Sequence, residues 1–566
     1  MSFAAIRRRR GGALASAYVP PVITGNYARF APRYAALPTG ITFNGTTGRY
    51  DGTVLDTTEP TWAVTNSSLT DTGNAATNAS NLNALIGSYA SSMTQNTRIL
   101  VPYTSQHRGE ISLPSNTTGF WLGIYTSHYS SLPALSPGTS VGTKSANRVN
   151  ASHLAHMPEF YGSYTNESCF NTISATSQKF FVRGMSATNR LGFVNDGSMF
   201  TAWSGYPSDI IFAQVAADGG GYAGGVRRAC NLGGQRLAFI DSYIDNVGQA
   251  VPDCQGVLIF PGVGPYKQTN CYMKIGGAAE NFLVGGYGLP GTDATYLPAD
   301  IEVRGNYFDK PFASGLHKNH VEVKLGRRIL VEGNACSGHN GGGQQVSIVI
   351  KLTDQSSPNT ATDTTDVTVA NNRVLDGPGG IVVTGGEFYS GTNTTRRVDI
   401  KNNVIMPLTV FPGRGLVFGS GNTGPINTLD VQWNTVIGAP ASINTYAPAV
   451  FFNNSSSATA MTLKNNALVG ADGCGSGIVN GSDGGNGEAG YAACVSSGVF
   501  LTNLINSTSG FPHQIPVANL ASMGFVNAAG GDYALSGASA GHAAGDGGFD
   551  VGADFSLNTA IISGVV

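Results

Sequence analysis

Between Ile301 and Leu468 the chain repeats one pattern of hydrophobic and polar positions at intervals of about 30 residues. Two apolar residues flank one variable residue, an Asn follows three positions later, and a further apolar residue follows two positions after it. The copies are Ile301-Val303-Asn306-Phe308, Ile329-Val331-Asn334-Cys336, Val367-Val369-Asn372-Val374, Val398-Ile400-Asn403-Ile405, Leu429-Val431-Asn434-Val436 and Met461-Leu463-Asn466-Leu468. Alternate residues of a strand point to the same side, so each copy predicts a short strand whose apolar pair points inward and whose intervening residues face solvent. Such strands, repeated at this interval, are typical of a solenoid.

The Asn after each strand predicts a turn with a specific hydrogen-bonding role. Asn tolerates a left-handed backbone, and its amide can bond neighbouring main chain. We expect the six Asn side chains to stack in one column, as a ladder that satisfies turn groups near the core. Weaker copies lie upstream, at Phe180-Val182-Met185, Ile210-Phe212-Val215-Ala217 and Leu237-Phe239-Ser242-Ile244.

The ends of the chain depart from the repeat. Residues 1–75 form a predicted N-terminal arm or attachment region, and residues 76–566 a predicted solenoid with end caps, with coils over about 95–525. Residues 78–93 have apolar residues at helical spacing, which predicts a helix that covers the first coil. These apolar residues are Leu82, Leu85, Ile86 and Tyr89. The tail from Asp532 to Phe555 is expected to close the other end.

The first 20 residues carry a basic run, Arg7, Arg8, Arg9 and Arg10, followed by a short, glycine-diluted apolar stretch. A twin-arginine export signal has a longer apolar stretch, so we do not interpret this segment as one. We expect the four arginines to bind acidic groups of another chain in an assembly.

Composition narrows the function classes. Charged residues make up 12% of the chain and the net charge is −2, which gives no global attraction to nucleic acid. The chain has no apolar run long enough to span a membrane. Its seven cysteines form neither a disulfide framework nor a metal-binding motif. Cys336 is expected to be a buried thiol, and whether Cys474 pairs with Cys494 stays open.

Several stretches resemble the right-handed parallel β-helix repeat proteins of bacteria and phages, in the pectate-lyase-like superfamily. They are Asn81–Leu85, Glu280–Gly286, Ala299–Phe308, Arg327–Asn334 and Asp550–Asp554. The resemblance covers residues 78–560 and implies an all-β, right-handed parallel β-helix. Known members include polysaccharide lyases and hydrolases, which work on an outward sheet face with clustered carboxylates, with or without Ca²⁺.

The repeat brings two outward acidic residues together. Asp399 and Asp430 occupy the same position in consecutive coils, about 4.8 Å apart along the stacking direction. Two such carboxylates share a proton, bind a cation, or are offset by a neighbour such as Lys401. We rank this column first for glycan or cation contact, and a salt bridge to Lys401 is the structural alternative. Arg304 and Glu332 predict a cross-strand ion pair.

A second candidate cluster contains His317 and His320, followed by Glu322 and Lys324. Two histidines three residues apart with a nearby carboxylate suit acid–base work or metal binding, although exposed loop residues give the same pattern. The pattern fixes no metal site and requires no cofactor; Ca²⁺ stays an option that the resemblance implies.

Two classes of function remain. The first is a virion-associated spike, fibre or decoration protein of a phage, a homo-oligomer such as a trimer, anchored to other virion proteins by its N-terminus and contacting host polysaccharide. The second is a secreted or cell-surface protein of bacteria that cleaves or only binds polysaccharide. The absence of a recognisable export signal favours the first.

Overall fold

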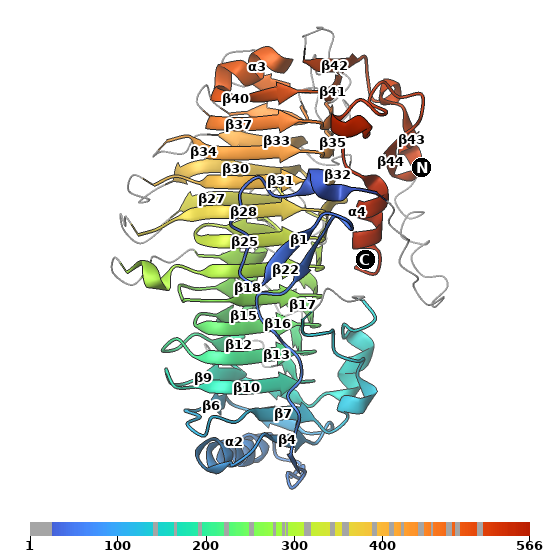
Figure 1. Cartoon of the computed structure of the whole chain (residues 1–566). Helices are drawn as coiled ribbons and strands as arrows, with labels where there is room; N and C mark the ends of the chain where they lie inside the picture. The colour runs from blue at the N-terminus through green and yellow to red at the C-terminus, as the bar shows by residue number, and fades with distance from the viewer. Residues whose placement is uncertain are drawn as a thin grey trace.

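The computed structural model describes residues 25–565, except 140–144, 164–166, 191–194, 220–225, 248–253, 276–278, 286–288, 290–292, 311–317, 340–345, 354–360, 388–392, 407–412, 420–423, 440–446, 454–456, 471–477, 481–486 and 507–512. This part of the chain forms a right-handed parallel β-helix, as predicted, with three long sheets that run along the solenoid (Figure 1). Each coil contributes one strand to each sheet, so consecutive strands of one sheet are three apart in number.

The strands fall into three parallel ladders. The first sheet contains β3 (Val64–Asn66), β4 (Thr97–Val101), β7 (Leu122–Thr126), β10 (Gln178–Arg183), β13 (Ser208–Ala213), β16 (Gln235–Ile240), β19 (Tyr266–Thr269), β22 (Ala299–Arg304), β25 (Gly326–Glu332), β28 (Thr364–Ala370), β31 (Arg396–Lys401), β34 (Ile426–Gln432), β37 (Ala458–Lys464) and β40 (Val495–Leu501). The second contains β5 (Gln106–Arg108), β8 (Glu159–Tyr161), β11 (Ser186–Thr188), β14 (Ala216–Asp218), β17 (Tyr243–Val247), β20 (Tyr272–Ile275), β23 (Tyr307–Asp309), β26 (Ala335–Ser337), β29 (Arg373–Val374), β32 (Val404–Ile405), β35 (Thr435–Ile437), β38 (Ala467–Val469), β41 (Asn503–Asn506) and β42 (Gln514–Val517). The third contains β6 (Ile111–Leu113), β9 (Phe170–Thr172), β12 (Asn195–Ala202), β15 (Val226–Leu232), β18 (Cys254–Ile259), β21 (Ala279–Val284), β24 (Val321–Val323), β27 (Ile348–Thr353), β30 (Gly379–Glu387), β33 (Arg414–Gly419), β36 (Val450–Phe452) and β39 (Ile478–Asn480).

The remaining elements lie at the ends and on the sides of the solenoid. Two antiparallel hairpins are β1 (Ile41–Asn44) with β2 (Arg49–Gly52), and β43 (Phe525–Asn527) with β44 (Asp532–Leu535). The α-helices are α2 (Ala75–Ser92), α3 (Gly487–Cys494) and α4 (Phe555–Ile562). Short 3-10 helices are η2 (Tyr27–Phe30), η3 (Tyr129–Ser131), η4 (Ala151–His156), η5 (Ala294–Tyr296), η6 (Ala521–Met523), η7 (Ala528–Gly530) and η8 (Asp546–Gly548).

The core is the column of inward apolar residues that the repeat predicted. Ile301, Val303, Ile400 and Leu463 are fully buried, and Cys336 is a buried residue of the same core, as expected. Each coil buries its inward residues only against its neighbours, so one elongated core replaces the several cores of a globular chain of this length.

The asparagine ladder is confirmed. The Oδ1 of Asn403 accepts hydrogen bonds from the backbone N–H and the Nδ2 of Asn372, each at 3.0 Å. The same pair of bonds joins each ladder Asn to the next, from Asn306 to Asn503, one coil beyond the repeat that the sequence showed. The left-handed residue is the one before each ladder Asn, for example Asn402 at φ 53° and Trp433 at φ 59°, rather than the ladder Asn itself.

The predicted capping helix is α2. It begins three residues earlier than expected because Asn74 caps it by accepting a hydrogen bond from the Thr77 N–H. Leu82 and Ile86 enter the core, and Leu85 and Tyr89 pack against it. Figure 1 places α2 at the first coils of the solenoid.

The prediction that the tail closes the far end is wrong. Helix α3 lies at that end, and its Tyr491 and Cys494 belong to the core. The tail instead folds back along the side of the solenoid, as Figure 1 shows, with Met523 and Val551 packed on outward apolar residues of the second sheet. The physical reason is that Ala467 and Leu504, on the outer face of that sheet, need a cover from water.

Candidate functional site

The structure brings together the first site that the sequence predicted. Asp399 and Asp430 are direct partners in the register of β31 and β34. The Nζ of Lys401 lies 2.8 Å from the Oδ2 of Asp430. Asp399, Asp430 and Lys401 are each at most 2% exposed. The expected cross-strand pair is also present, with Arg304 Nε 2.7 Å from Glu332 Oε2.

This face of the first sheet is covered rather than open. We call residues 25–66 the N-terminal strap; in Figure 1 it descends along the front of the first sheet, antiparallel to the growth of the solenoid. The backbone N–H of Arg33 donates to Asp399 Oδ2 at 3.1 Å, and Lys401 Nζ donates to the Ala31 carbonyl at 2.6 Å. The expectation that outward residues face solvent is therefore wrong along this stretch, because the strap uses the charged side chains as its hydrogen-bonding partners.

The strap is held in the same way further along. The Glu302 Oε2 accepts from Thr53 Oγ1 at 2.7 Å and from the Val54 N–H at 3.1 Å. Arg304 donates from Nη1 to the Gly52 carbonyl at 3.0 Å. Each buried charge thus meets a backbone group or an opposite charge, which is the condition for tolerating it under cover.

Burial shapes the electrostatics of the Asp399 carboxyl. Loss of solvent raises its pKa to about 7, and nearby Asp430 adds to the rise, while Lys401 opposes it. At pH 7 about half of the Asp399 carboxyl groups therefore carry a proton beneath the strap. A catalytic role for Asp399, Lys401 and Asp430 stays a prediction; in this structure their contacts fix the strap.

The second predicted cluster is divided by the fold. His317 lies outside the described residues. His320 is fully buried, with its Nδ1 3.0 Å from the Oδ1 of Asn281, so it belongs to the interior rather than to an open loop.

Glu322 lies instead in a buried charged group on the third sheet. Lys351 Nζ is 3.2 Å from Glu322 Oε1, and Lys318 Nζ is 3.4 Å from Glu280 Oε1. Burial, reinforced by the negative charge of Glu322, raises the pKa of Glu280 to about 7. Both glutamates are inaccessible to solvent in the structure, so this group does not present an open site.

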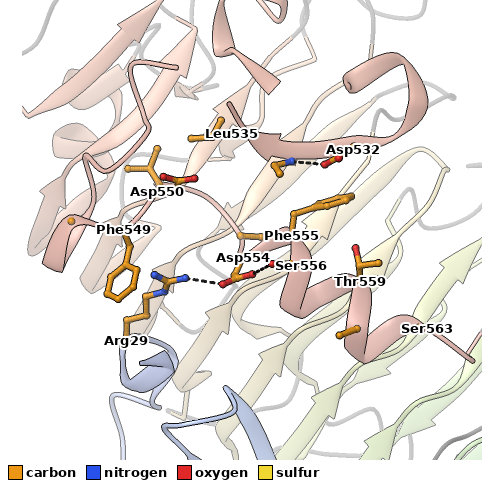
Figure 2. Close-up of a pocket in the computed structure, with 15 residues that line it drawn as sticks. Arg29, Asp532, Leu535, Phe549, Asp550, Asp554, Phe555, Ser556, Thr559 and Ser563 are labelled. Atoms are coloured by element: carbon orange, nitrogen blue, oxygen red, sulfur yellow. Dashed lines mark hydrogen bonds and ion pairs between the residues drawn. The ribbon is translucent and has the colours of Figure 1, made fainter. Parts of the chain in front are cut away.

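An open pocket of about 790 Å³ lies where the tail meets the N-terminal strap (Figure 2). Pockets of a few hundred to about 1,000 Å³ are the size of ligand sites. Helix α4 forms one wall, β44 another, and the segment 548–554 with Arg29 the third. Residues that line it include Arg29, Asp532, Leu535, Phe549, Asp550, Asp554, Phe555, Ser556, Thr559 and Ser563.

The strap completes this pocket through Arg29. Its Nη2 lies 3.1 Å from Asp554 Oδ2, and its guanidinium carbon lies 3.9 Å from the centre of the Phe549 ring. Asp554 also caps α4 by accepting from the Leu557 N–H at 2.9 Å. Arg29 and Asp554 neutralise each other and are fixed by packing, so they build the wall of the pocket.

The other groups of the pocket are more available. Asp532 Oδ1 accepts from the Ala534 N–H at 3.0 Å, a bond that fixes the carboxylate and occupies one of its acceptor positions. Ser556 and Thr559 are exposed on one face of α4, and the Phe555 ring is half-buried between them and Asp532, as Figure 2 shows. The pocket therefore combines an apolar ring, hydroxyls and a carboxylate.

Sequence reasoning marked Asp550–Asp554 only as a closure of the fold and did not find this pocket. Two other predictions concern residues outside the described ranges: the Arg7–Arg10 run, and Cys474 as a partner for Cys494. Over the described ranges, no group of three His, Cys, Asp or Glu side chains is placed to hold a metal ion. In the same part of the chain, no helix has the length and apolarity to cross a membrane.

No protein-family model matches the chain, and no curated protein matches it in sequence. Solved structures similar to it include the catalytic domain of a GH87 α-1,3-glucanase, an Asp-to-Ala variant, in complex with nigerose, at 12% identity and a TM-score of 0.39, covering 79% of this chain and 69% of that one. The catalytic domain of the same kind of enzyme with tetrasaccharides matches at 11% identity and a TM-score of 0.39, with the same coverage. At these identities the likeness is one of fold.

Proposed function

We propose that this protein binds glycans through the pocket at its C-terminal tail, as a component of a phage particle that contacts host-surface polysaccharide. The observation that carries the proposal is the pocket itself. Among the described residues it joins an accessible phenyl ring, Phe555, to the hydroxyl of Thr559 and the carboxylate of Asp532.

The chemistry of these groups matches that of a sugar. A pyranose ring presents an apolar C–H face and a rim of hydroxyls, so it needs an apolar surface beside hydrogen-bond donors and acceptors. The hydroxyls of Ser556 and Thr559 can donate or accept, and Asp532 accepts. Because Arg29 and Asp554 are paired with each other, the pocket keeps its shape without a ligand, which lowers the entropy cost of binding.

The covered first sheet supports binding over cleavage. A polymer that lay along the outward face of that sheet would have to displace the strap from Asp399 and Lys401. The tail pocket needs no such displacement.

The particle role rests on the N-terminus. Strap residue Arg29 forms part of the pocket wall, so the basic run Arg7–Arg10 is tethered within about 20 residues of the binding site. We propose that this run binds acidic groups of other virion proteins, and that the strap passes the attachment on to the solenoid. The alternative is a secreted or cell-surface glycan-binding protein of a bacterium, in which deletion of residues 1–24 has no effect on assembly.

The pocket is tested by filling it. Thr559→Trp puts an indole into the cavity from the exposed face of α4, and Ala538→Trp, an exposed tail position outside the pocket lining, is the matched control. We expect the full chain and Ala538→Trp to bind at least one member of a panel of bacterial surface polysaccharides, and Thr559→Trp to lose that binding with an unchanged thermal melt. Equal binding by both variants would place the site elsewhere.

Cleavage is a second candidate, favoured by the raised pKa of Asp399 beside Asp430. It predicts release of reducing ends or unsaturated products from a panel polysaccharide, and loss of that release in both Asp399→Asn and Asp430→Asn. Unchanged product release in both variants would exclude this column.

A further inference from the structure

The charges around the tail pocket are unequal. Asp532, Asp550 and Asp554 line it, whereas the cations near them are Arg29 and Arg373. Among the described residues around the pocket, three carboxylates against two guanidiniums leave one negative charge. His542 lies beside this group, with its Nδ1 2.7 Å from Asp550 Oδ1.

The position of each charge identifies the one that is free to act on a ligand. Asp554 is taken up by Arg29 and by the start of α4. Asp550 accepts from the Ala543 N–H at 2.9 Å and faces His542, and both side chains of that pair are more than two-fifths exposed. Asp532 is half-buried, and its Oδ1 accepts a hydrogen bond from the backbone N–H of Ala534.

The cations, in contrast, are engaged by the protein. Arg29 lies over the Phe549 ring at 3.9 Å and pairs with Asp554. Arg373 lies 4.8 Å from the Phe555 ring centre, with Nη2 donating to Thr559 Oγ1 at 2.9 Å and Nε to Asn558 Oδ1 at 3.0 Å. Within the part of the chain that the structure describes, the Nε and Nη1 of Arg29 have no hydrogen-bond partner but are buried, so they are closed to an anionic sugar, and Arg373 does not line the pocket.

From this asymmetry we propose that the pocket selects glycans carrying a free amino sugar and rejects uronate or other acidic residues. The inference rests on the proposed function of the pocket and specifies its ligand. A protonated amine on a pyranose ring would pair with the Asp532 carboxylate while the apolar face of the sugar meets the Phe555 ring. A carboxylate at the same place would meet Asp532 and Asp550 and be repelled.

The test compares sugars that differ in one group. A β-1,4-linked glucosamine oligomer and the matching glucose oligomer differ only at carbon 2, as an ammonium or a hydroxyl; an oligogalacturonate supplies the acidic case. Titration calorimetry on the full chain, below the pKa of the amine, should give at least about tenfold tighter binding for the glucosamine oligomer than for the glucose oligomer, the range of a hydrogen bond to a charged group. The oligogalacturonate should bind weakest.

Asp532→Asn keeps the shape and the bond from Ala534 but removes the charge, so it should abolish most of the preference for the glucosamine oligomer over the glucose oligomer. Asp546→Asn, a charge removed from the same tail outside the pocket lining, should retain the preference. Equal affinities for the two oligomers, tighter binding of the galacturonate, or a preference that survives Asp532→Asn would overturn the amino-sugar inference. If a tetra-arginine peptide competes for the pocket more strongly than the glucosamine oligomer binds to it, the amino-sugar inference is overturned in favour of a basic protein segment as the ligand. Failure to bind any member of the wider polysaccharide panel would overturn the proposed function itself.

Discussion

Removing one ladder side chain should destabilise the solenoid far more than its small size suggests. Asn403→Ala takes away a buried amide whose Oδ1 accepts from the backbone N–H of Asn372 at 3.0 Å and whose Nδ2 donates to the Val369 carbonyl at 2.9 Å. It also breaks the bond from Nδ2 to Asn434 Oδ1 at 3.0 Å. Two backbone groups of the preceding coil, the Asn372 N–H and the Val369 carbonyl, then lose this partner out of reach of water. At about 1–3 kcal/mol for each unsatisfied group, we expect a loss of about 2–6 kcal/mol.

The measurement is urea unfolding followed by far-ultraviolet circular dichroism, with Asn427→Ala as the control. Asn427 is exposed at the start of β34, outside the ladder, so its replacement should change stability by less than about 0.5 kcal/mol. Because a solenoid can lose coils separately, the curve for Asn403→Ala is expected to show an early transition of the coils around it. A curve that superimposes on that of Asn427→Ala would refute the view that the column satisfies otherwise stranded backbone groups.

Three further predictions follow from the same contacts. The pKa of Asp399 in the folded protein, about 7, exceeds its usual value, so the contribution of this carboxyl to stability is present below about pH 4 and is lost as the pH rises toward 7. Asp399→Asn should therefore be more stable than the parent at pH 8, by up to about 4 kcal/mol, and should melt at the same temperature as the parent at pH 4. A lower melting temperature of the variant at pH 8 would contradict the assignment. Ile400→Asp places an unpaired charge in the core and should cost several kcal/mol, whereas soluble, unchanged expression and melting would show that the side chain does not point inward. Asp554→Ala removes the cap of α4 and the partner of Arg29, so hydrogen exchange should accelerate in α4 but not in the ladder coils. An equal change of the exchange rates in α4 and in the ladder coils would mean that the tail and the strap do not depend on this pair.

Local patterning was enough to predict the solenoid. The apolar pair and the Asn are set by contacts between equivalent residues of adjacent coils, so a repeat in sequence becomes a column in space, as Ile400 and Asn403 illustrate. The exact turn was harder to predict, because the left-handed conformation falls on the preceding residue, which varies from Gly305 to Trp433.

The strap could not be read from the same pattern. An outward Glu302 or Lys401 has one sequence signature whether it faces water or the backbone of another segment. Only the partner differs, and Val54 and Ala31 lie hundreds of residues away. The strap has no repeat of its own, and many of its bonds to the sheet use backbone groups, which carry no sequence signal.

The tail pocket was hidden for a related reason. It joins Arg29 to residues beyond Asp532, from opposite ends of the chain. A clue existed in the outward apolar residues of the second sheet, such as Val404 and Leu504, which predict a covering segment on that side. Their significance appears only once it is known which faces the strap already covers.

The central claim is that ligand enters the tail pocket and leaves the strap-covered face of the first sheet untouched. Hydroxyl-radical footprinting of the full chain, with and without the tightest-binding oligosaccharide, tests it directly. The account predicts protection of Phe549 and Phe555, both half-buried in the free protein, with no change at Tyr34 or Phe43 of the strap. Protection confined to the strap or to the Asp399–Asp430 column, with Phe549 and Phe555 unchanged, would contradict it.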